Sequence, residues 1–370
     1  MKTLLALILG SAVLTGLTAK SVDVYFGTGT SSDAIGIFHA KFDPNTGKLG
    51  ERTLAAKIKE PEFLALHPNG SHLYAVAKKD VPVLAAYRIA ADGTLALLNT
   101  VPMRNGQGAH LAVHPSGKFL ITAQYFEGSV GVFPLADNGS VEEQTQVLPH
   151  ANPSKVHRRQ MKPHPHWTGF SPDGAFALVP DLGTDNIHLY RVDLDGRALT
   201  PHGLTRSGPG SGPRHMRFSA DGKFVHLLNE LTVAVSTFAY DADAGSAILL
   251  HTTPALSDRA RAKYPETTGS EILVHPHGRF LYSANRGHDS VTVFEADPAT
   301  GALTRVQTES IRGSWPRHTR IDPTGKWLFV SGEASNTVSI FAINPENGTL
   351  TFRRGDVINL PSVYCILFKD

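Results

Sequence analysis

The sequence predicts an all-β fold, a seven-bladed β-propeller with four antiparallel strands in each blade. The first observation behind this prediction is a tight-turn motif that recurs at spacings of 47, 57, 48, 56 and 47 residues. The second is the series of short apolar runs that follows each turn, and the third is that the two ends of the chain complement each other. The copies of the motif are His67-Pro-Asn-Gly, His114-Pro-Ser-Gly, Ser171-Pro-Asp-Gly, Ser219-Ala-Asp-Gly, His275-Pro-His-Gly and Asp322-Pro-Thr-Gly.

Each copy of the motif lies between two apolar runs, as expected for the turn between the first and second strands of a blade. The run KFLITA, which begins at Lys118, is an example of the strand after the turn. A polar loop then leads to a third strand, such as SVTVF from Ser290. A second glycine-bearing turn, such as DPATGAL from Asp297, leads to the fourth strand.

Six turn motifs predict seven blades because the two ends of the chain each supply part of one more. Residues 22–49 contain the second and third strands and the closing turn of a blade but lack its first strand. The C-terminal run VYCILF, residues 363–368, resembles a first strand with nothing after it. Pairing the two ends would complete the seventh blade, remove an exposed sheet edge and hold both termini. We therefore expect one closed domain over residues 21–370.

Composition and charge narrow the function classes. Of the 370 residues 41% are apolar, which is enough for a large core, and 34 Gly and 24 Pro indicate many turns. A formal charge of +2 with no basic run argues against a nucleic-acid partner.

Residues 1–20, MKTLLALILGSAVLTGLTAK, are predicted to form a secretory signal peptide, with an early lysine, an apolar run and small residues. The apolar run is shorter than the roughly 20 residues that a membrane-spanning helix needs. The alternative to a cleaved signal peptide is an uncleaved membrane anchor. This segment predicts a periplasmic or secreted protein, with no membrane association beyond that possible anchor.

Most of the 18 histidines and the single cysteine are expected to be structural. His67, His114 and His275 occupy a turn position at which side chains bond locally. Cys365 lies in an apolar strand and is predicted to be a buried thiol with no disulfide partner. No Cys/His or His/carboxylate spacing matches a strong metal signature, so neither a metal nor a cofactor is expected.

Departures from the repeat are where a function is expected, because the fold does not require them. The loop before the first strand and the loop between the second and third strands lie on one face of a propeller, around the channel. The position five before each turn motif is held in consecutive blades by Glu62, Ala109, His166, Arg214, Ser270, Arg317 and, in the closing blade, Tyr364. The position eight after each turn glycine is held by Lys78, Tyr125, Leu182, Glu230, Arg286, Glu333 and, in the first blade, about Thr30. We call these fourteen positions the ring.

Charge and imidazole concentrate in one sector of the ring, which predicts a binding or catalytic site there. An imidazole can act as a general base or acid near neutral pH, and guanidinium groups can hold an anion and stabilise a developing oxyanion. A plain set of salt bridges lining a solvated channel is the alternative. The candidate catalytic residues are His166, Arg214, Glu230 and Arg286. The candidate substrate-binding residues are Arg317, Glu333, Asp181 and Asn285, the last two being the neighbours of ring positions 182 and 286.

Two further groups of histidines are less informative. His110, His215 and His318 share the position directly after the first ring position, and this recurrence favours a structural role. The long irregular loop of residues 138–165 carries several histidine and basic side chains and is expected either to overhang the channel as a lid or to be mobile.

The segments HPHWTGFSPDGAFALVPDLGTDNIHLY, GPRHMRFSADGKFVHLLNEL, EILVHPHGRFLYSANRGHDSVTVF and WPRHTRIDPTGKWLFVSG resemble the lactonase family of seven-bladed propellers. This family includes a bacterial 6-phosphogluconolactonase and the fungal 3-carboxy-cis,cis-muconate cyclase. The resemblance extends over essentially the whole chain after residue 20. It implies that His166, Arg214, Glu230 and Arg286 match the proposed active site of the cyclase branch.

The residues and the resemblance together predict a hydrolase that opens a small, sugar-derived or anionic lactone, with a lactone or carboxylate as its ligand. In this hypothesis His166 activates water, Arg214 and Arg286 stabilise the oxyanion and the product carboxylate, and Glu230 orients Arg214 or transfers a proton. Two alternatives stay open: a lactonizing cyclase of muconate type, and a non-catalytic propeller that binds an anionic ligand or a protein.

Overall fold

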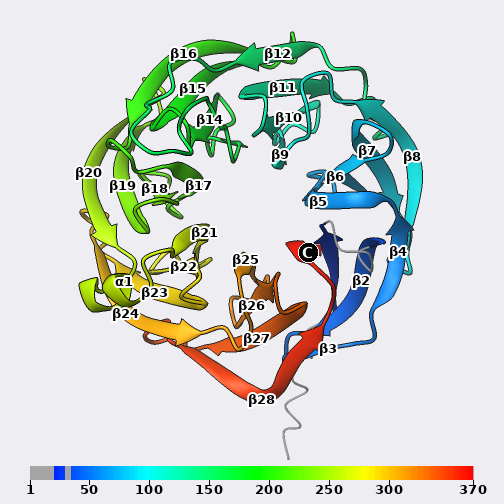
Figure 1. Cartoon of the computed structure of the whole chain (residues 1–370). Coiled ribbons are helices and arrows are strands. Elements are labelled where there is room, and N and C mark those ends of the chain that lie inside the picture. Colours follow the sequence, from blue (N-terminus) through cyan, green and yellow to red (C-terminus); the bar gives the residue numbers. More distant parts are fainter. Residues whose placement is uncertain (1–20, 30–34, 370) are drawn as a thin grey trace, which may run out of the picture.

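A computed structural model describes residues 21–29 and 35–369, which form seven antiparallel sheets arranged as blades around a central channel (Figure 1). The predicted signal peptide, residues 1–20, lies outside the described residues. The one α-helix among the described residues is α1, Asp258–Lys263. Within the described ranges, no helix has the length and apolar character needed to cross a membrane.

The closing blade joins the two ends of the chain, as predicted. Strand β29 (Val363–Lys369) is innermost and pairs antiparallel with β1, where Phe368 lies opposite Val24. The fourth strand position is divided between two short strands, both of which pair with β2. The remaining strands of this blade are β1 (Val22–Thr28), β2 (Gly36–Asp43), β3 (Lys48–Leu49) and β4 (Thr53–Lys57).

The other six blades each contain four strands in chain order from the channel outward. The second and third blades are β5 (Lys59–Leu66), β6 (His72–Lys78), β7 (Pro82–Ile89), β8 (Leu95–Pro102) and β9 (His110–Val113), β10 (Phe119–Gln124), β11 (Ser129–Pro134), β12 (Gln146–Pro149). The fourth and fifth are β13 (Gly169–Phe170), β14 (Phe176–Asp181), β15 (Asn186–Asp193), β16 (Ala198–Arg206) and β17 (Pro213–Phe218), β18 (Phe224–Asn229), β19 (Ala234–Asp241), β20 (Ser246–Pro254). The sixth and seventh are β21 (Thr268–Val274), β22 (Phe280–Arg286), β23 (Ser290–Ala296), β24 (Leu303–Ser310) and β25 (Pro316–Ile321), β26 (Trp327–Gly332), β27 (Thr337–Ile343), β28 (Leu350–Asn359).

The recurring turn histidines are architectural, as predicted, and they also connect neighbouring blades. The Nδ1 atom of His114 accepts a hydrogen bond from the backbone of Ser116, 3.0 Å away, within its own turn. Its Nε2 atom lies 3.0 Å from the carbonyl oxygen of Gly174 in the next blade. His275 makes the same inter-blade contact with Gly325 at 2.8 Å. Each such histidine therefore closes one turn and bridges to the next.

Apolar side chains between neighbouring blades form the core. In the closing blade, Phe42 packs edge-on against Phe329 of the seventh blade, with ring centroids 4.9 Å apart. Cys365 is buried in the adjoining cluster, and burial raises the pKa of its thiol to about 12. The thiol is therefore a structural side chain, as predicted from its apolar strand.

Candidate active site

β-Bulges in the innermost strands set the first ring position. The pairing of β17 with β18 skips one residue between Pro213 and His215, which leaves Arg214 out of the ladder. Similar register shifts in β5, β21, β25 and β29 include the other ring residues of those strands. A bulge leaves one residue unpaired and re-aims its side chain. The same irregularity therefore recurs around the channel and presents a ring of side chains at one face.

In the fourth blade the innermost strand starts late, and His166 lies ahead of it. The backbone N–H of His166 donates to the carbonyl oxygen of Pro180 at 3.1 Å, and an isolated bridge pairs Pro165 with Asp181. These contacts hold the residue beside the channel without placing it in a regular ladder.

A cavity of about 250 Å³ opens among the ring residues. Charged, imidazole and phenol groups dominate its wall, and three of them are arginines from different segments. The lining residues are Glu62, Gln107, Gly108, Ala109, Tyr125, Phe126, Arg159, His166, Glu230, Arg286, Arg317 and Tyr364. Three of the four predicted catalytic residues thus share one small cavity.

Glu230 is the electrostatic centre of this cavity. It follows β18, is 1% exposed, and forms ion pairs with Arg214, Arg286 and Arg159. The Nη2 atom of Arg286 lies 2.7 Å from Oε1, and the Nε atom of Arg214 lies 2.9 Å from Oε2. Burial alone would raise the pKa of Glu230, but the three guanidinium groups hold it well below its usual range. Glu230 is therefore a fixed anion that orients arginines, and it is poorly suited to proton transfer.

Arg214 lies behind the cavity wall. Its side chain is 2% exposed, and its Nη1 atom donates to the backbone carbonyl of Ser270 in the next blade. The Nε contact with Glu230 lacks hydrogen-bond geometry and is an ion pair only. Burial and the neighbouring Arg286 lower the pKa of Arg214 to about 9, so it stays protonated at neutral pH. Arg214 therefore contacts Glu230 from behind and does not itself line the cavity.

His166 is 6% exposed and faces the cavity with a neutral ring. Burial, followed by the charge of Arg214 and the neighbouring His215 ring, holds its pKa well below the usual range of histidine. Its Nδ1 atom is buried without a hydrogen-bond partner among the described residues. The Tyr125 ring packs edge-on against it, with centroids 5.2 Å apart. A neutral imidazole in this setting can accept a proton.

Arg317 and Glu333, the predicted substrate-binding pair, come from the seventh blade and form only a loose ion pair. Their closest atoms, Nε and Oε2, are 3.9 Å apart. Glu333 accepts a hydrogen bond from the hydroxyl of Tyr364 at 2.9 Å, and the guanidinium of Arg317 lies 4.6 Å from the Tyr364 ring centroid. Arg317 lines the cavity, whereas Glu333 supports it from behind.

The long loop before β13 supplies a residue that the ring argument missed. Arg159 lines the cavity, pairs with Glu230, and donates from Nη2 to the hydroxyl of Tyr125 at 2.9 Å. The loop therefore overhangs the site, which is one of the two expectations for residues 138–165. The predicted loop is too long, however, because residues 146–149 form β12, which pairs with β11. Its basic residues were visible in the sequence, but nothing in the repeat showed which of them reaches inward.

Asp181, a predicted substrate-binding residue, is instead an internal brace for this loop. It is fully buried, and its Oδ1 atom accepts from the backbone N–H groups of His164, Gly183 and Thr184 at 2.8–3.0 Å. Its Oδ2 atom lies 2.6 Å from Nδ1 of His150. With both oxygens engaged inside the protein, Asp181 is not available to a ligand in the cavity.

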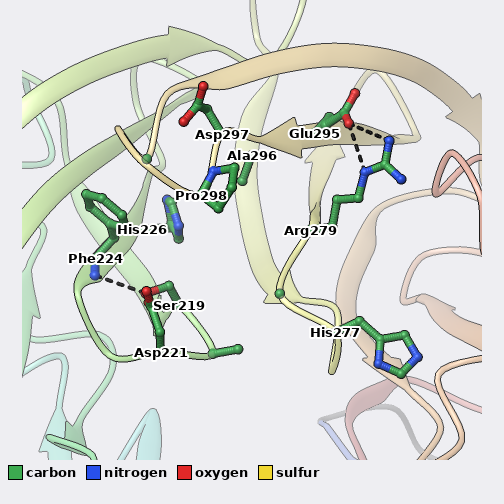
Figure 2. A pocket seen from close by; sticks show the side chains of 13 residues that line it. Ser219, Asp221, Phe224, His226, His277, Arg279, Glu295, Ala296, Asp297 and Pro298 are labelled. Atoms are coloured by element: carbon green, nitrogen blue, oxygen red, sulfur yellow. Dashed lines mark hydrogen bonds and ion pairs between the residues drawn. The ribbon is translucent and has the colours of Figure 1, made fainter.

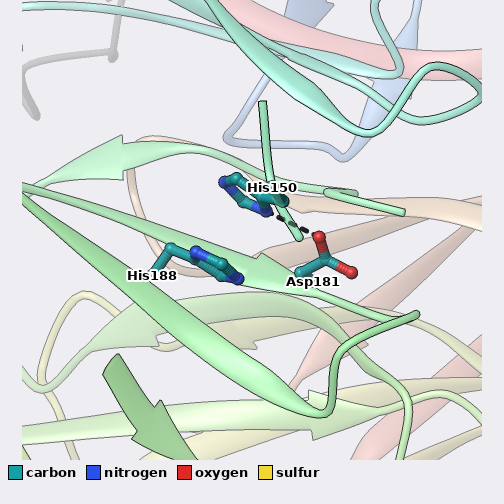
Figure 3. A group of neighbouring side chains, drawn as sticks. All are labelled: His150, Asp181 and His188. Atoms are coloured by element: carbon teal, nitrogen blue, oxygen red, sulfur yellow. Dashed lines mark hydrogen bonds and ion pairs between the residues drawn. The ribbon is translucent and has the colours of Figure 1, made fainter. Parts of the chain in front are cut away.

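His150, Asp181 and His188 lie close enough together to suggest a metal site, but their geometry opposes it (Figure 3). The two imidazole rings stack with centroids 3.5 Å apart and planes within 9°. An imidazole binds a metal ion through a lone pair in its ring plane, and two stacked planes cannot share one ion. The second nitrogen of His150 also contacts the hydroxyl of Tyr190 at 2.8 Å. This group is a structural network.

Asn285, the other predicted substrate-binding neighbour, is also removed from the cavity. It is fully buried, and its Nδ2 atom donates to Ser290 at 3.1 Å and to Thr292 at 3.0 Å. It supports the end of β22, where Arg286 lies, and does not line the cavity. Ring position Thr30 lies outside the described residues, and Lys78 pairs with Glu60 at 3.6 Å without lining the cavity.

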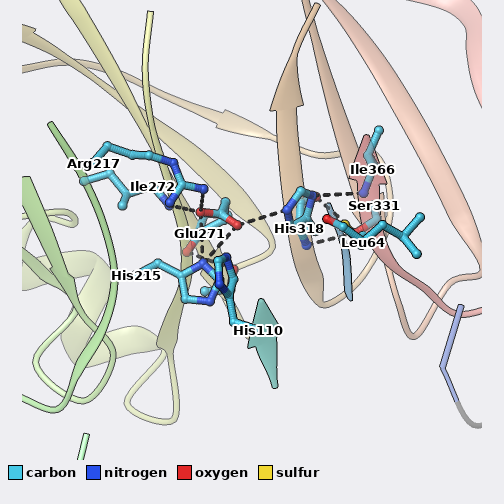
Figure 4. Close-up of polar contacts among 12 residues, drawn as sticks. Leu64, His110, His215, Arg217, Glu271, Ile272, His318, Ser331 and Ile366 are labelled. Atoms are coloured by element: carbon cyan, nitrogen blue, oxygen red, sulfur yellow. Dashed lines mark hydrogen bonds and ion pairs between the residues drawn. The ribbon is translucent and has the colours of Figure 1, made fainter. Parts of the chain in front are cut away.

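A buried polar layer lies next to the cavity along the channel (Figure 4). Glu271 is its centre, with Nδ1 of His215 at 3.0 Å, Nη2 of Arg217 at 2.9 Å and Nε2 of His318 at 3.2 Å. His110 packs beside His215, with ring centroids 5.5 Å apart. The three histidines of this register are buried and structural, as their recurrence predicted, and the layer supports His166 through the His215 ring.

A second cavity, of about 430 Å³, lies on the opposite face between the fifth and sixth blades (Figure 2). The turn motif at Ser219 and the turn at Asp297 line it, at the other end of the strands from Arg214 and Glu230. A cavity with equivalent lining, including His67 and His72, lies between the second and third blades. Because this groove recurs with the repeat, it is a product of blade packing rather than a specific site.

The comparisons with known proteins agree with this architecture. A family model described as "Lactonase, 7-bladed beta-propeller" matches residues 23–368. The chain is 35% identical over 295 residues to the 6-phosphogluconolactonase of Bacillus subtilis, in an alignment that covers 79% of this chain and 83% of the relative. It is 33% identical over 295 residues to the 6-phosphogluconolactonase of Formosa agariphila, covering 76% and 81%.

A solved structure, the periplasmic gluconolactonase of Pseudomonas aeruginosa, superposes with a TM-score of 0.87 at 28% identity, over 95% of this chain and 99% of its own. The fold, the family model and the identity to curated relatives lead to one conclusion. The chain belongs to the lactonase family of seven-bladed β-propellers.

Proposed function

We propose that this protein is a hydrolase that opens a small sugar-derived lactone at the cavity of the ring. The observation that carries the proposal is that one cavity of about 250 Å³ contains a neutral imidazole, His166, together with three guanidinium groups. Hydrolysis of a lactone needs a base for water and positive charge for the oxyanion. The relatives reported above are named as lactonases of gluconic acid derivatives, which supports the same substrate class.

In the proposed mechanism the lactone carbonyl points toward the arginines. His166 accepts a proton from a water molecule as that water attacks the carbonyl carbon. Arg286 and Arg159, which line the cavity beside Glu230, stabilise the charge that develops on the carbonyl oxygen and then on the product carboxylate. Arg214 acts indirectly, by holding Glu230 in place.

Arg317 supplies a further cation at the cavity wall, and its carboxylate partner is distant at 3.9 Å. This separation leaves the guanidinium free to contact a hydroxyl or an anionic substituent of the substrate. Neither the muconate-type cyclase nor the non-catalytic propeller is favoured by a specific observation, because the relatives reported above are named as hydrolases.

We also propose that the protein is exported, with residues 1–20 acting as a signal peptide. The composition of this segment supports export, and a periplasmic gluconolactonase with the same fold is a precedent for lactone hydrolysis outside the cytoplasm.

The test of the proposed function is a panel of glucono-δ-lactone, its 6-phosphate, a muconolactone and 3-carboxy-cis,cis-muconate, with products identified by NMR. We expect ring opening of at least one sugar lactone and no lactonization of the muconate. Lactonization without sugar-lactone hydrolysis would support the cyclase, and binding of an anion with no turnover would support the non-catalytic propeller.

A further inference from the structure

We propose that Glu62 is a second proton-transfer residue of this site, the general acid that protonates the ring oxygen of the lactone as it leaves. This inference rests on the proposed lactone hydrolysis and extends it to the leaving group of the reaction. Two observations support it. Glu62 lines the cavity, and the other carboxylates around the cavity already have hydrogen-bond or ion-pair partners.

Glu62 occupies the same ring position in its blade as His166 and Arg214 do in theirs. It lies in the irregular part of β5, between the register pairs of Lys59 and Phe63, where the bulge turns its side chain toward the channel. It lines the same cavity as His166 and Arg286. Glu62 is therefore placed where it can contact the same small ligand.

The other carboxylates around the cavity are engaged. Glu230 pairs with three arginines, and Glu271 pairs with Arg217 and two histidines. Glu333 accepts a hydrogen bond from Tyr364. The carboxyl group of Glu62, by contrast, has no hydrogen bond or ion pair with any residue that the structure describes. A carboxyl group without such a partner remains free to exchange a proton with a substrate.

The charges around Glu62 keep it near its titration point at neutral pH. Burial raises its pKa to about 7. Arg317 of β25 and Lys78 of β6 oppose this rise, whereas Glu60 of its own strand and Glu333 reinforce it. The phenol of Tyr364 from β29 lies on the same cavity wall. A catalytic acid works best when its pKa is close to the working pH.

The proposed hydrolysis accounts for every bond and proton. Water oxygen forms a bond to the carbonyl carbon while one of its protons moves to His166. The bond between the carbonyl carbon and the ring oxygen then breaks, and the carboxylic acid of Glu62 gives its proton to that oxygen, which becomes a hydroxyl. The product is a hydroxy acid, which ionises to a carboxylate. Proton exchange with solvent returns His166 to its neutral form and Glu62 to its acid form.

The test compares two lactones with different leaving groups. Glucono-δ-lactone expels an alkoxide, which needs protonation, whereas dihydrocoumarin expels a phenolate, which leaves readily without it. We expect Glu62→Gln to lower kcat on glucono-δ-lactone by about 10²-fold, within the usual range for a general acid, and on dihydrocoumarin by less than about tenfold. His166→Ala is expected to reduce both reactions strongly, because both need the base.

Three controls make the result decisive. Glu60→Gln removes a neighbouring carboxylate that pairs with Lys78 and does not line the cavity, so it should leave both reactions unchanged at a pH low enough to keep Glu62 protonated. Because Glu60 helps to raise the pKa of Glu62, this variant should also shift the pH profile toward lower pH. Glu62→Asp keeps the acid and should recover part of the lost rate. Thermal unfolding of each variant shows whether it is folded.

The pH profile gives a second readout. Because the protonated form is the active one, kcat/KM of the wild type should fall as the pH rises through about 7, after subtraction of spontaneous hydrolysis. Glu62→Gln should lack this decrease. Equal losses on the two lactones, or a folded Glu62→Gln variant with wild-type activity, would overturn the role of Glu62 while the proposed function stands. A wild-type protein that hydrolyses neither of these lactones nor the 6-phosphate of glucono-δ-lactone would overturn the proposed function and this role with it.

Discussion

The guanidinium of Arg159 and the carboxylate of Glu230 form an ion pair that connects the long loop before β13 to the end of β18. Glu230 is already paired with Arg214 and Arg286, so the loop completes a cluster of three cations around one buried anion. The cluster carries net positive charge on the wall of a small cavity. This arrangement favours a ligand that gains negative charge during the reaction.

Replacement of Arg159 tests the contribution of the loop. We expect Arg159→Ala to reduce kcat/KM for the lactone about 10- to 100-fold, because one oxyanion-stabilising cation is lost while the buried pairs of Glu230 remain. Steady-state kinetics measure this effect. Arg158→Ala, at the exposed neighbouring position, is the matched control and should behave as wild type. Equal activity of both variants would remove Arg159 from the site.

Replacement of Glu230 tests the same cluster through stability. Glu230→Gln leaves Arg214 and Arg286 buried with no anionic partner, and the loss of one partner from a buried ion pair costs about 3–5 kcal/mol. We therefore expect a clear decrease in Tm together with loss of activity. Glu333→Gln, at a half-buried position with a looser ion pair, should change Tm much less. A Tm decrease of the same size in both variants would contradict this account of Glu230.

The pH dependence at acid pH reports on His166. Burial and the charge of Arg214 hold the pKa of His166 well below its usual range, and the neutral form is the one that accepts a proton from water. Activity should therefore persist as the pH falls through the ordinary histidine range and be lost only below it. Measurement of kcat/KM between about pH 4.5 and pH 7 checks this expectation. A half-maximal loss near the ordinary pKa of histidine would show a solvated ring and contradict the structure.

The brace at Asp181 can be tested apart from the cavity. Burial would raise the pKa of Asp181, but its bond to His150 and the backbone N–H groups lower it. A depressed folded-state pKa stabilises the fold above the unfolded pKa, and this stability is lost as the pH falls through the folded value. At neutral pH Asp181→Asn should cost about 2 kcal/mol or more, because hydrogen bonds to a charged group are lost.

Urea unfolding measures this cost, and the exposed Asp195→Asn is the matched control. Because Asp181 also holds the loop that carries Arg159, KM should rise as well. A chelator should change neither the urea midpoint nor the activity, since stacked rings cannot share a metal ion. A chelator-dependent loss of stability would show that His150, Asp181 and His188 rearrange to bind one.

The repeat made most of this architecture predictable from the sequence. The turn motifs located the blades, and the incomplete first blade with the unpaired C-terminal run predicted the pairing of β1 with β29. Register then brought His166, Glu230 and Arg286 to one cavity, because equivalent positions of a propeller lie on one circle. Arg214 has the right register and still lies one layer back, where its guanidinium donates to the backbone carbonyl of Ser270 in the next blade.

Register wrongly assigned Asp181 and Asn285 to the site and did not identify Arg159. Asp181 and Asn285 precede ring positions by one, and neighbouring strand residues point to opposite sides, so both turn into the blade. Arg159 belongs to the long connection between β12 and β13, which lies outside the repeating strands and turns, so no repeat position predicts where it lies. The carboxyl group of Glu62 has no hydrogen bond or ion pair with a described residue, whereas the neighbouring carboxylates do. Only the three-dimensional arrangement shows this difference.

The most direct test of the central claim is kcat/KM for hydrolysis of glucono-δ-lactone by wild type, His166→Ala and Arg286→Ala. The account predicts turnover well above spontaneous hydrolysis in the wild type. It also predicts a decrease of about 10²-fold or more in each folded variant, the usual effect of losing a general base or an oxyanion-stabilising group. Wild-type rates that survive in both variants would show that lactone chemistry takes place elsewhere on the protein.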